Sequence, residues 1–218
     1  MSDLTPIQEH ILKANEAYAK DFTKSDLPLP PTKHYAIITC MDARINPFAA
    51  FGINLGEAHI IRNGGGNVKE GIRSLLVSTL DLETKEILVI KHTNCGLSTV
   101  SNWEALKEVA TNLGAKALLE LETTVGHDIM PIDDVEEAVK KDVEYLKSSA
   151  LIKDDVVISG WVYDIETGRQ PIFDGPFLAF VGEAVRSVRK YLETNVTQTW
   201  KSPRLVDTMP LSEALPVL

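Results

Sequence analysis

The amino-acid sequence predicts a single α/β domain with a mainly parallel central sheet flanked by helices and preceded by an N-terminal helical arm. Three nearly continuous apolar runs, at residues 34–40, 58–62 and 86–93, alternate with stretches of helical character. Parallel strands are covered on both faces, so they are typically continuous apolar runs, and a β, α, β, α, β order supplies the crossovers that they need. The 218 residues can bury one core, and no Ser- or Gly-rich linker divides them.

Residues 1–33 are predicted to form an arm and a connector. Thr5 can cap a helix that has Pro6 at its first position, and Gln8 completes a capping box. Apolar residues then repeat at helical spacing: Ile7, Ile11, Ala14, Tyr18 and Phe22. The prolines of residues 25–31 exclude a helix and favour an extended connector.

The predicted core comprises residues 34–192. After the first strand, Asn46 begins a short helical turn, and residues 155–164 form the last strand. Helical spacing predicts helices over 68–82, within 98–122, over 134–151 and over 177–192. The tail, residues 193–218, mixes apolar residues with prolines, which suggests a segment that another surface covers, such as a second subunit.

Composition and charge exclude several classes of function. The formal net charge of −9 leaves no broad electropositive surface for nucleic acid. The first thirty residues lack the pattern of a secretory signal, and no apolar run approaches the roughly 20 residues that span a bilayer. Only two cysteines are present, as is usual in a reducing compartment. We therefore expect a cytoplasmic protein without a nucleic-acid or membrane partner.

Three side chains that can bind a metal follow the ends of two predicted parallel strands. Cys40 ends the first strand, and His92 and Cys95 lie at the end of the third. The carboxyl ends of parallel strands meet at one edge of the sheet, so the three side chains can converge there. Two thiolates and one imidazole suit zinc, and three protein ligands leave a fourth position open, as in catalytic zinc sites. The sequence therefore predicts one Zn²⁺ per chain.

Other interpretations of the cysteines remain open at this point. Buried cysteines commonly serve as small apolar filler. A disulfide between Cys40 and Cys95 is a further alternative, although it leaves His92 unexplained and does not suit a reducing compartment.

The motifs around these residues resemble a known family. Cys40-Met41-Asp42-Ala43-Arg44 and His92-Thr93-Asn94-Cys95-Gly96 are similar to the C-x-D-x-R and H-x-x-C-G pair of the β-class carbonic anhydrases. The segment GEAHIIRNGGG (56–66) resembles the family's segment that leads to R-N-A-G-G, and GWVYDIETGR (160–169) resembles its final strand and turn. The resemblance is close over residues 34–97 and extends more loosely to residue 190.

The resemblance implies that Cys40, His92 and Cys95 hold zinc and that Asp42 and Arg44 form a catalytic pair. A carboxylate beside the metal can accept the proton of a metal-bound hydroxide and orient it, while a bidentate arginine keeps the carboxylate ionised and away from the metal. A salt bridge at a strand end, without a catalytic role, is the alternative for Asp42 and Arg44. Subunits of this family wrap around one another, so the resemblance also implies that this chain forms a homodimer or homotetramer.

The activity implied is attack of metal-bound hydroxide on a small linear heterocumulene. Hydration of carbon dioxide to bicarbonate is the family's usual reaction. Hydrolysis of carbonyl sulfide to hydrogen sulfide and carbon dioxide, as in the carbonyl sulfide hydrolase-like members, is a rival within the same chemistry. An alternative from another class is a non-catalytic, zinc-stabilised bicarbonate or redox sensor that keeps Asp42 on the metal.

A glycine-rich segment, residues 63–67, is expected to form a wall of the substrate pocket through Gly64 and Gly65. No phosphate-binding fingerprint accompanies it, so a nucleotide-binding loop is the weaker interpretation. Gly64 stands where the family pattern has alanine, and the missing methyl group widens the expected pocket. His59 is expected, from its offset to the motif, to line the same pocket, with a structural histidine as the alternative.

Overall fold

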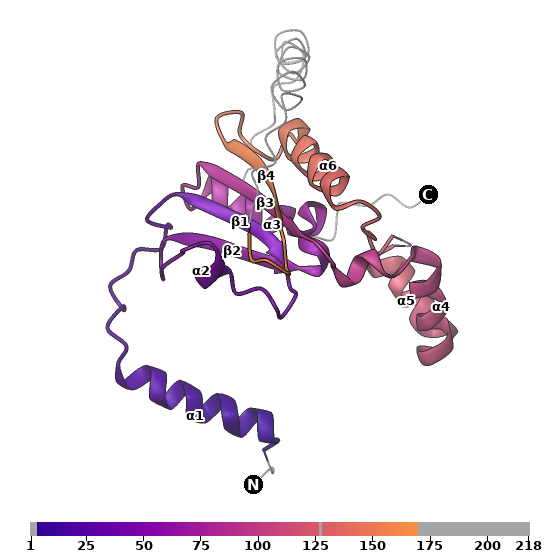
Figure 1. Cartoon of the computed structure of the whole chain (residues 1–218), viewed down its shortest axis with the longest axis horizontal. Helices are drawn as coiled ribbons and strands as arrows, with labels where there is room; N and C mark the ends of the chain where they lie inside the picture. The colour runs from indigo at the N-terminus through magenta and orange to yellow at the C-terminus, as the bar shows by residue number, and fades with distance from the viewer. Residues whose placement is uncertain (1–3, 127, 170–218) are drawn as a thin grey trace, which may run out of the picture. The chain divides into compact units, whose positions relative to one another are not determined.

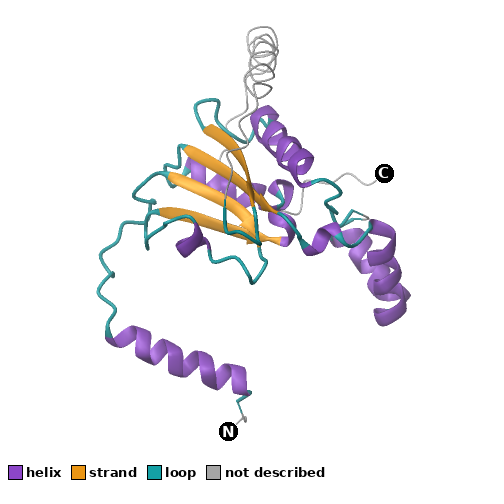
Figure 2. Cartoon of the chain, viewed as in Figure 1, coloured by secondary structure: helices purple, strands orange, loops and turns teal. Residues whose placement is uncertain are grey.

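The computed structural model describes residues 4–126 and 128–169, and within them one four-stranded sheet forms the centre (Figures 1 and 2). Its strands lie in the order β2-β1-β3-β4, and all three neighbouring pairs are parallel. The bounds of the strands are β1 Tyr35–Cys40, β2 Ala58–Asn63, β3 Glu86–His92 and β4 Val157–Tyr163. The predicted parallel α/β architecture is confirmed, and each predicted strand is present.

One face of the sheet is covered by the helices α3 (Val68–Leu80) and α6 (Val135–Ser148). Two glycines allow this close packing. A Cβ atom added at Gly71 of α3 would overlap Ile38, and one added at Gly160 of β4 would overlap Val139 of α6. The sheet and the helices therefore approach closely at these two positions.

The other face packs against the segment that follows β1. Asn46 caps the short helix α2 (Pro47–Ala50), as predicted, and its side chain accepts a hydrogen bond from the backbone N–H of Ala49. Beyond α2, Phe51 and Ile53 contact the face of the sheet that carries Ile37 and Ile90. This packing fixes the path of the chain just after the carboxyl end of β1.

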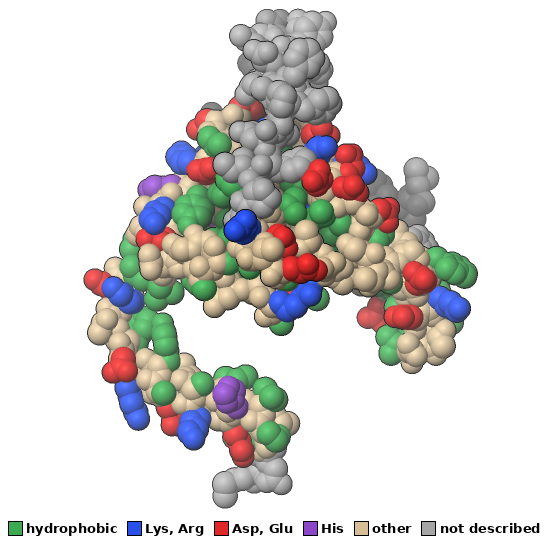
Figure 3. Space-filling view, in the orientation of Figure 1, with side chains coloured by type: hydrophobic (Ala, Val, Ile, Leu, Met, Phe, Trp, Pro, Cys, Tyr) green, Lys and Arg blue, Asp and Glu red, His purple; other side chains and the backbone are tan. Residues whose placement is uncertain are grey.

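The N-terminal helix α1 (Pro6–Lys20) begins with the predicted capping box between Thr5 and Gln8. None of its residues is buried. Its apolar side chains are exposed, among them Ile7 and Tyr18. Figure 3 shows hydrophobic and charged side chains side by side on this helix.

The stretch predicted to be mostly helical within 98–122 contains two helices that are separated by a break. A short 3₁₀ turn, η2 (Gly96–Ser98), leads to α4 (Asn102–Leu113), and a second helix, α5 (Ala115–Thr124), follows. Gly114 separates α4 from α5 because its φ of 86° lies outside the helical region. Ser101 and Glu104 form the capping box of α4.

Two predictions lie outside the described residues, namely the helix over 177–192 and the tail 193–218. The carboxyl boundary of the core at residue 192 also falls there. None of the helices within residues 4–126 and 128–169 has both the length and the apolarity that crossing a bilayer requires.

Candidate metal centre and active site

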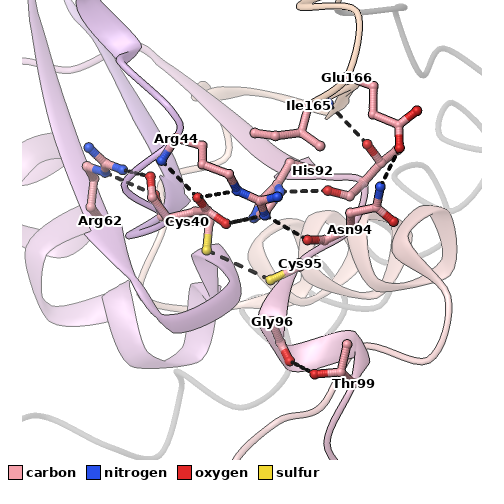
Figure 4. A network of polar contacts seen from close by, with 12 residues as sticks. Cys40, Arg44, Arg62, His92, Asn94, Cys95, Gly96, Thr99, Ile165 and Glu166 are labelled. Atoms are coloured by element: carbon pink, nitrogen blue, oxygen red, sulfur yellow. Dashed lines mark hydrogen bonds and ion pairs between the residues drawn. The ribbon is translucent and has the colours of Figure 1, made fainter.

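Cys40, His92 and Cys95 converge at the carboxyl edge of the sheet, as the strand ends predicted (Figure 4). Their candidate ligand atoms all lie within 4.8 Å of one another, and all three residues are buried. Cys40 and His92 are the last residues of β1 and β3. Cys95 reaches the same place because Asn94 adopts a left-handed φ of 52°, which turns the chain directly after the strand. Residues 55 positions apart thus form one buried cluster that can hold a metal ion.

The two cysteines are free thiols. Their Sγ atoms are 3.9 Å apart, which is well beyond the ~2.05 Å of a disulfide bond. The disulfide alternative therefore does not describe this structure.

The state of His92 provides a test of whether these residues fit a metal. Its Nδ1 lies 2.8 Å from the carbonyl oxygen of Thr93, so Nδ1 carries the proton and donates it. Its Nε2 is buried and has no hydrogen-bond partner among the described residues. Burying a polar atom without a hydrogen-bond partner costs free energy, but a metal ion can bind the lone pair of such a nitrogen. Histidines that bind a metal through one nitrogen commonly donate the N–H of the other to a carbonyl oxygen, as His92 does here. The donor set therefore fits a metal ion.

The electrostatics of the cysteines favour one thiolate. The hydrogen bond from Cys95 lowers the pKa of the Cys40 thiol, and contacts with His92 and with the backbone N–H groups of Asp42 and Gly65 act in the same direction. The same Cys40 contact, together with burial, raises the pKa of Cys95. Burial disfavours the charged form of His92, but Cys40, the Thr93 backbone and the Asp42 charge together outweigh it, and they raise the pKa of His92.

Asp42 lies beside the cluster and is held by Arg44. Arg44 donates from Nε to Oδ1 of Asp42 over 2.9 Å and from Nη2 to Oδ2 over 2.6 Å, so the pair is bidentate as predicted. The backbone N–H of Arg44 donates a third hydrogen bond, to Oδ1, over 2.9 Å. These contacts hold the pKa of Asp42 well below its usual range. Oδ2 of Asp42 is 3.8 Å from Nε2 of His92, so an ionised, oriented carboxylate adjoins the candidate metal position.

The arginine of the RNGGG segment also contributes to the site, which the sequence reasoning missed. Arg62 donates from Nε to the carbonyl oxygen of Cys40 over 2.9 Å and from Nη2 to that of Asp42 over 2.6 Å (Figure 4). It thereby fixes the backbone on both sides of Met41. The available signal was its position as the last residue of the strand predicted over 58–62, which the structure places opposite Thr39 near the carboxyl edge of the sheet.

The glycine turn lies next to Cys40. It forms η1 (Gly64–Gly66), in which Gly65 and Gly66 adopt left-handed φ values of 67° and 60°. A Cβ atom at Gly66 would lie 2.8 Å from the carbonyl carbon of Thr39, and one at Gly65 would lie 2.9 Å from Cδ1 of Leu97. At Gly64 a Cβ atom would meet only Cδ1 of Leu97, at 3.7 Å. The turn therefore needs glycine at 65 and 66, whereas position 64 has room for a methyl group.

The structure does not bring His59 to this cluster. The register pairs His59 with Ala36 and Asn63 with Cys40, so His59 lies four residues, or ~13 Å, before the carboxyl edge. Its Nδ1 forms a hydrogen bond of 2.7 Å with Oγ of Ser78 in α3. This position agrees with a structural role for His59, which was the alternative to a role in the substrate pocket.

Comparisons with known proteins agree with this geometry. A family model described as carbonic anhydrase matches residues 35–170. Beta-carbonic anhydrase 1 of Mycobacterium tuberculosis is 33% identical over 75% of this chain and 95% of its own length, and a carbon disulfide hydrolase of Acidithiobacillus thiooxidans is 31% identical over 72% and 87%. A solved carbonic anhydrase from Glaciozyma antarctica is 37% identical and superposes with a TM-score of 0.73 over 78% of this chain and all of that one. The chain is thus an enzyme of the β-carbonic anhydrase family.

Proposed function

We propose that the chain hydrates carbon dioxide to bicarbonate with one zinc ion held by Cys40, His92 and Cys95. The observation that carries the proposal is the free Nε2 of His92, buried within 4.8 Å of two thiol sulfurs and 3.8 Å from a carboxylate oxygen of Asp42. Membership of the carbonic anhydrase family supports the same chemistry.

Zinc held by Cys40, His92 and Cys95 would supply a Lewis acid that lowers the pKa of water at the site. The surrounding residues then have distinct tasks. The Asp42 carboxylate accepts a hydrogen bond from the attacking water and orients it. Arg44 keeps that carboxylate ionised and fixed by its two side-chain hydrogen bonds.

A second substrate class is supported by the carbon disulfide hydrolases among the relatives. Carbonyl sulfide and carbon disulfide are linear heterocumulenes like carbon dioxide, and sulfur is larger than oxygen. Gly64 leaves open the space beside Leu97 that an alanine methyl group would occupy. We propose carbonyl sulfide hydrolysis as the rival activity, and we expect Gly64→Ala to lower it more than carbon dioxide hydration.

The test measures zinc content, carbon dioxide hydration and sulfide release on the same purified samples of wild type and Asp42→Asn. The proposal predicts one zinc per chain in both samples and turnover that Asp42→Asn reduces, because the carboxamide no longer binds Arg44 as an anion. If the wild type releases sulfide from carbonyl sulfide faster than it hydrates carbon dioxide, carbonyl sulfide hydrolysis becomes the assigned activity. Zinc without turnover of either substrate would favour the sensor hypothesis.

The sensor hypothesis requires Asp42 to leave Arg44 and bind the metal. Both carboxylate oxygens are engaged by Arg44 in this structure, so that change must break two charge-assisted hydrogen bonds. The geometry therefore supports the enzyme better than the sensor.

We further propose that the protein works as a cytoplasmic homodimer or homotetramer. The exposed apolar face of α1 supports an arm that covers a second copy, because Ile7, Ile11 and Tyr18 are each more than half exposed. Light scattering during size-exclusion chromatography tests it, and deletion of residues 1–20 is expected to lower the mass to that of a smaller assembly.

A further inference from the structure

Lys91 is a charged residue buried in the core. It lies in β3 between Ile90 and His92 and is only 2% exposed. Lysine is almost never fully buried unless it is paired, because an ammonium ion loses its hydration there.

The ammonium of Lys91 donates to three oxygens from two other parts of the fold. Nζ lies 2.9 Å from Oδ2 of Asp142 on α6, 3.0 Å from the carbonyl oxygen of Gly65 and 3.2 Å from that of Gly66. A lysine has three N–H donors, so this set satisfies the whole group. Oδ2 of Asp142 also accepts a hydrogen bond of 3.3 Å from the backbone N–H of Val68, where α3 begins.

These contacts act on the turn that adjoins Cys40. Glycine has little conformational preference of its own, so a turn with two left-handed glycines needs an external constraint. Lys91 and Asp142 hold the carbonyl groups of Gly65 and Gly66 and the start of the helix that follows. On the other side of the turn, Gly66 packs against the backbone of Thr39 and Cys40.

We propose that Lys91 and Asp142 form a positioning pair that holds the glycine turn against Cys40 and thereby raises the affinity of the site for zinc. This inference rests on the proposed zinc site. A buried ion pair is a poor source of stability, since apolar replacements of similar shape are often neutral or stabilising. An apolar pair could not replace the hydrogen bonds that Lys91 donates to the carbonyl oxygens of Gly65 and Gly66.

The experiment compares wild type with the double variant Lys91→Met/Asp142→Leu, which leaves no buried charge unpaired. Ser78→Ala is the matched control, because Ser78 is a buried polar residue hydrogen-bonded to His59 and Thr84 and has no contact with the turn. Zinc affinity is measured by competition with a chelator. Amide hydrogen exchange at Gly65 and Gly66 and the melting temperature are measured on the metal-free proteins.

We expect the double variant to fold, to lose about 10- to 100-fold in zinc affinity and to exchange faster at Gly65 and Gly66. The Ser78→Ala control should keep wild-type zinc affinity even if its melting temperature falls. A folded double variant with wild-type affinity and wild-type exchange at the turn would overturn the proposal and leave the pair a purely structural role.

Asp142→Asn provides a second variant if the double variant does not fold, since the carboxamide still offers Val68 a hydrogen-bond acceptor but removes the negative charge that holds the Lys91 ammonium. Weaker zinc binding and faster exchange at the turn would support the proposal, and no change in either would contradict it. A wild type that binds no zinc would remove the proposed function together with this inference, whereas wild-type zinc binding that neither variant affects would remove only the inference.

Discussion

The guanidinium of Arg44 binds both carboxylate oxygens of Asp42, over 2.9 and 2.6 Å, from only two residues further along the chain. The same Nη2 donates to the carbonyl oxygen of Asn94 over 2.8 Å, so the arginine also spans from the loop after β1 to the turn after β3. Asn94 in turn donates to Glu166 over 2.7 Å (Figure 4). The orientation of Asp42 is thus tied to both strand ends that carry the candidate metal ligands.

Arg44→Lys is expected to reduce kcat/KM for carbon dioxide hydration about 10- to 100-fold while leaving one zinc per chain. Lysine keeps the charge but lacks the planar pair of donors, so it cannot hold both oxygens of Asp42 and reach Asn94 at once. Stopped-flow hydration assays and elemental analysis of the same samples check it. Arg73→Lys, at an exposed position on α3, is the matched control and should behave as wild type. Unchanged turnover in Arg44→Lys would show that the bidentate geometry is not needed.

Gly66→Ala and Gly64→Ala form a pair that tests the glycine turn. At Gly66 a methyl group meets the Thr39 backbone at 2.8 Å and φ is 60°, so we expect the free energy of unfolding to fall by about 1–3 kcal/mol. At Gly64 the methyl group finds ordinary contact with Leu97 at 3.7 Å, and we expect wild-type stability. Denaturant unfolding of the metal-free variants measures both values. Equal stability of the two variants would contradict the described conformation of the turn.

His59 predicts a pH dependence of stability that does not involve the metal centre. Burial lowers the pKa of His59 from its ordinary value of 6.5, so the unfolded chain binds a proton at this position more readily than the folded one. The stability that neutral His59 contributes is therefore present above pH 6.5 and is lost as the pH falls through the folded pKa.

His59→Asn should make the free energy of unfolding fall less steeply between pH 7.5 and 5.5, because asparagine preserves the contact with Ser78 without titrating. His10→Asn, on the exposed helix α1, serves as the control and should keep the wild-type slope. Identical slopes for wild type and His59→Asn would refute the prediction.

Much of the fold could be predicted from the sequence, because strands that are buried on both faces of a sheet appear as nearly continuous apolar runs. The runs that became β1 and β3 are nearly continuously apolar, and Thr5 and Asn46 begin the helices that their side chains cap. The helix α1 shows the limit of such reasoning. Its apolar periodicity is clear, but none of its residues is buried in this chain, and periodicity does not tell which surface a helix packs against.

The candidate site was predictable to the extent that strand ends determine it. Cys40 and His92 end neighbouring parallel strands, so topology brings them to one edge, and the turn at Asn94 brings Cys95 to the same place. His59 was expected in the pocket because it stands only a few residues before the glycine turn, but each residue of an extended strand adds about 3.3 Å, so four residues keep it away from the carboxyl edge. Lys91 and Arg62 escaped notice because their roles depend on backbone carbonyl groups of other segments, and no residue pattern encodes those partners.

The most direct test of the account is the zinc content per chain of purified wild type and Cys95→Ala, with carbon dioxide hydration assayed on the same samples. The account predicts one zinc per wild-type chain, and loss of both the metal and the turnover in the variant, because Cys95 supplies one of three ligands. A well-folded wild type that hydrates carbon dioxide without zinc, or a Cys95→Ala variant that keeps both metal and activity, would contradict it.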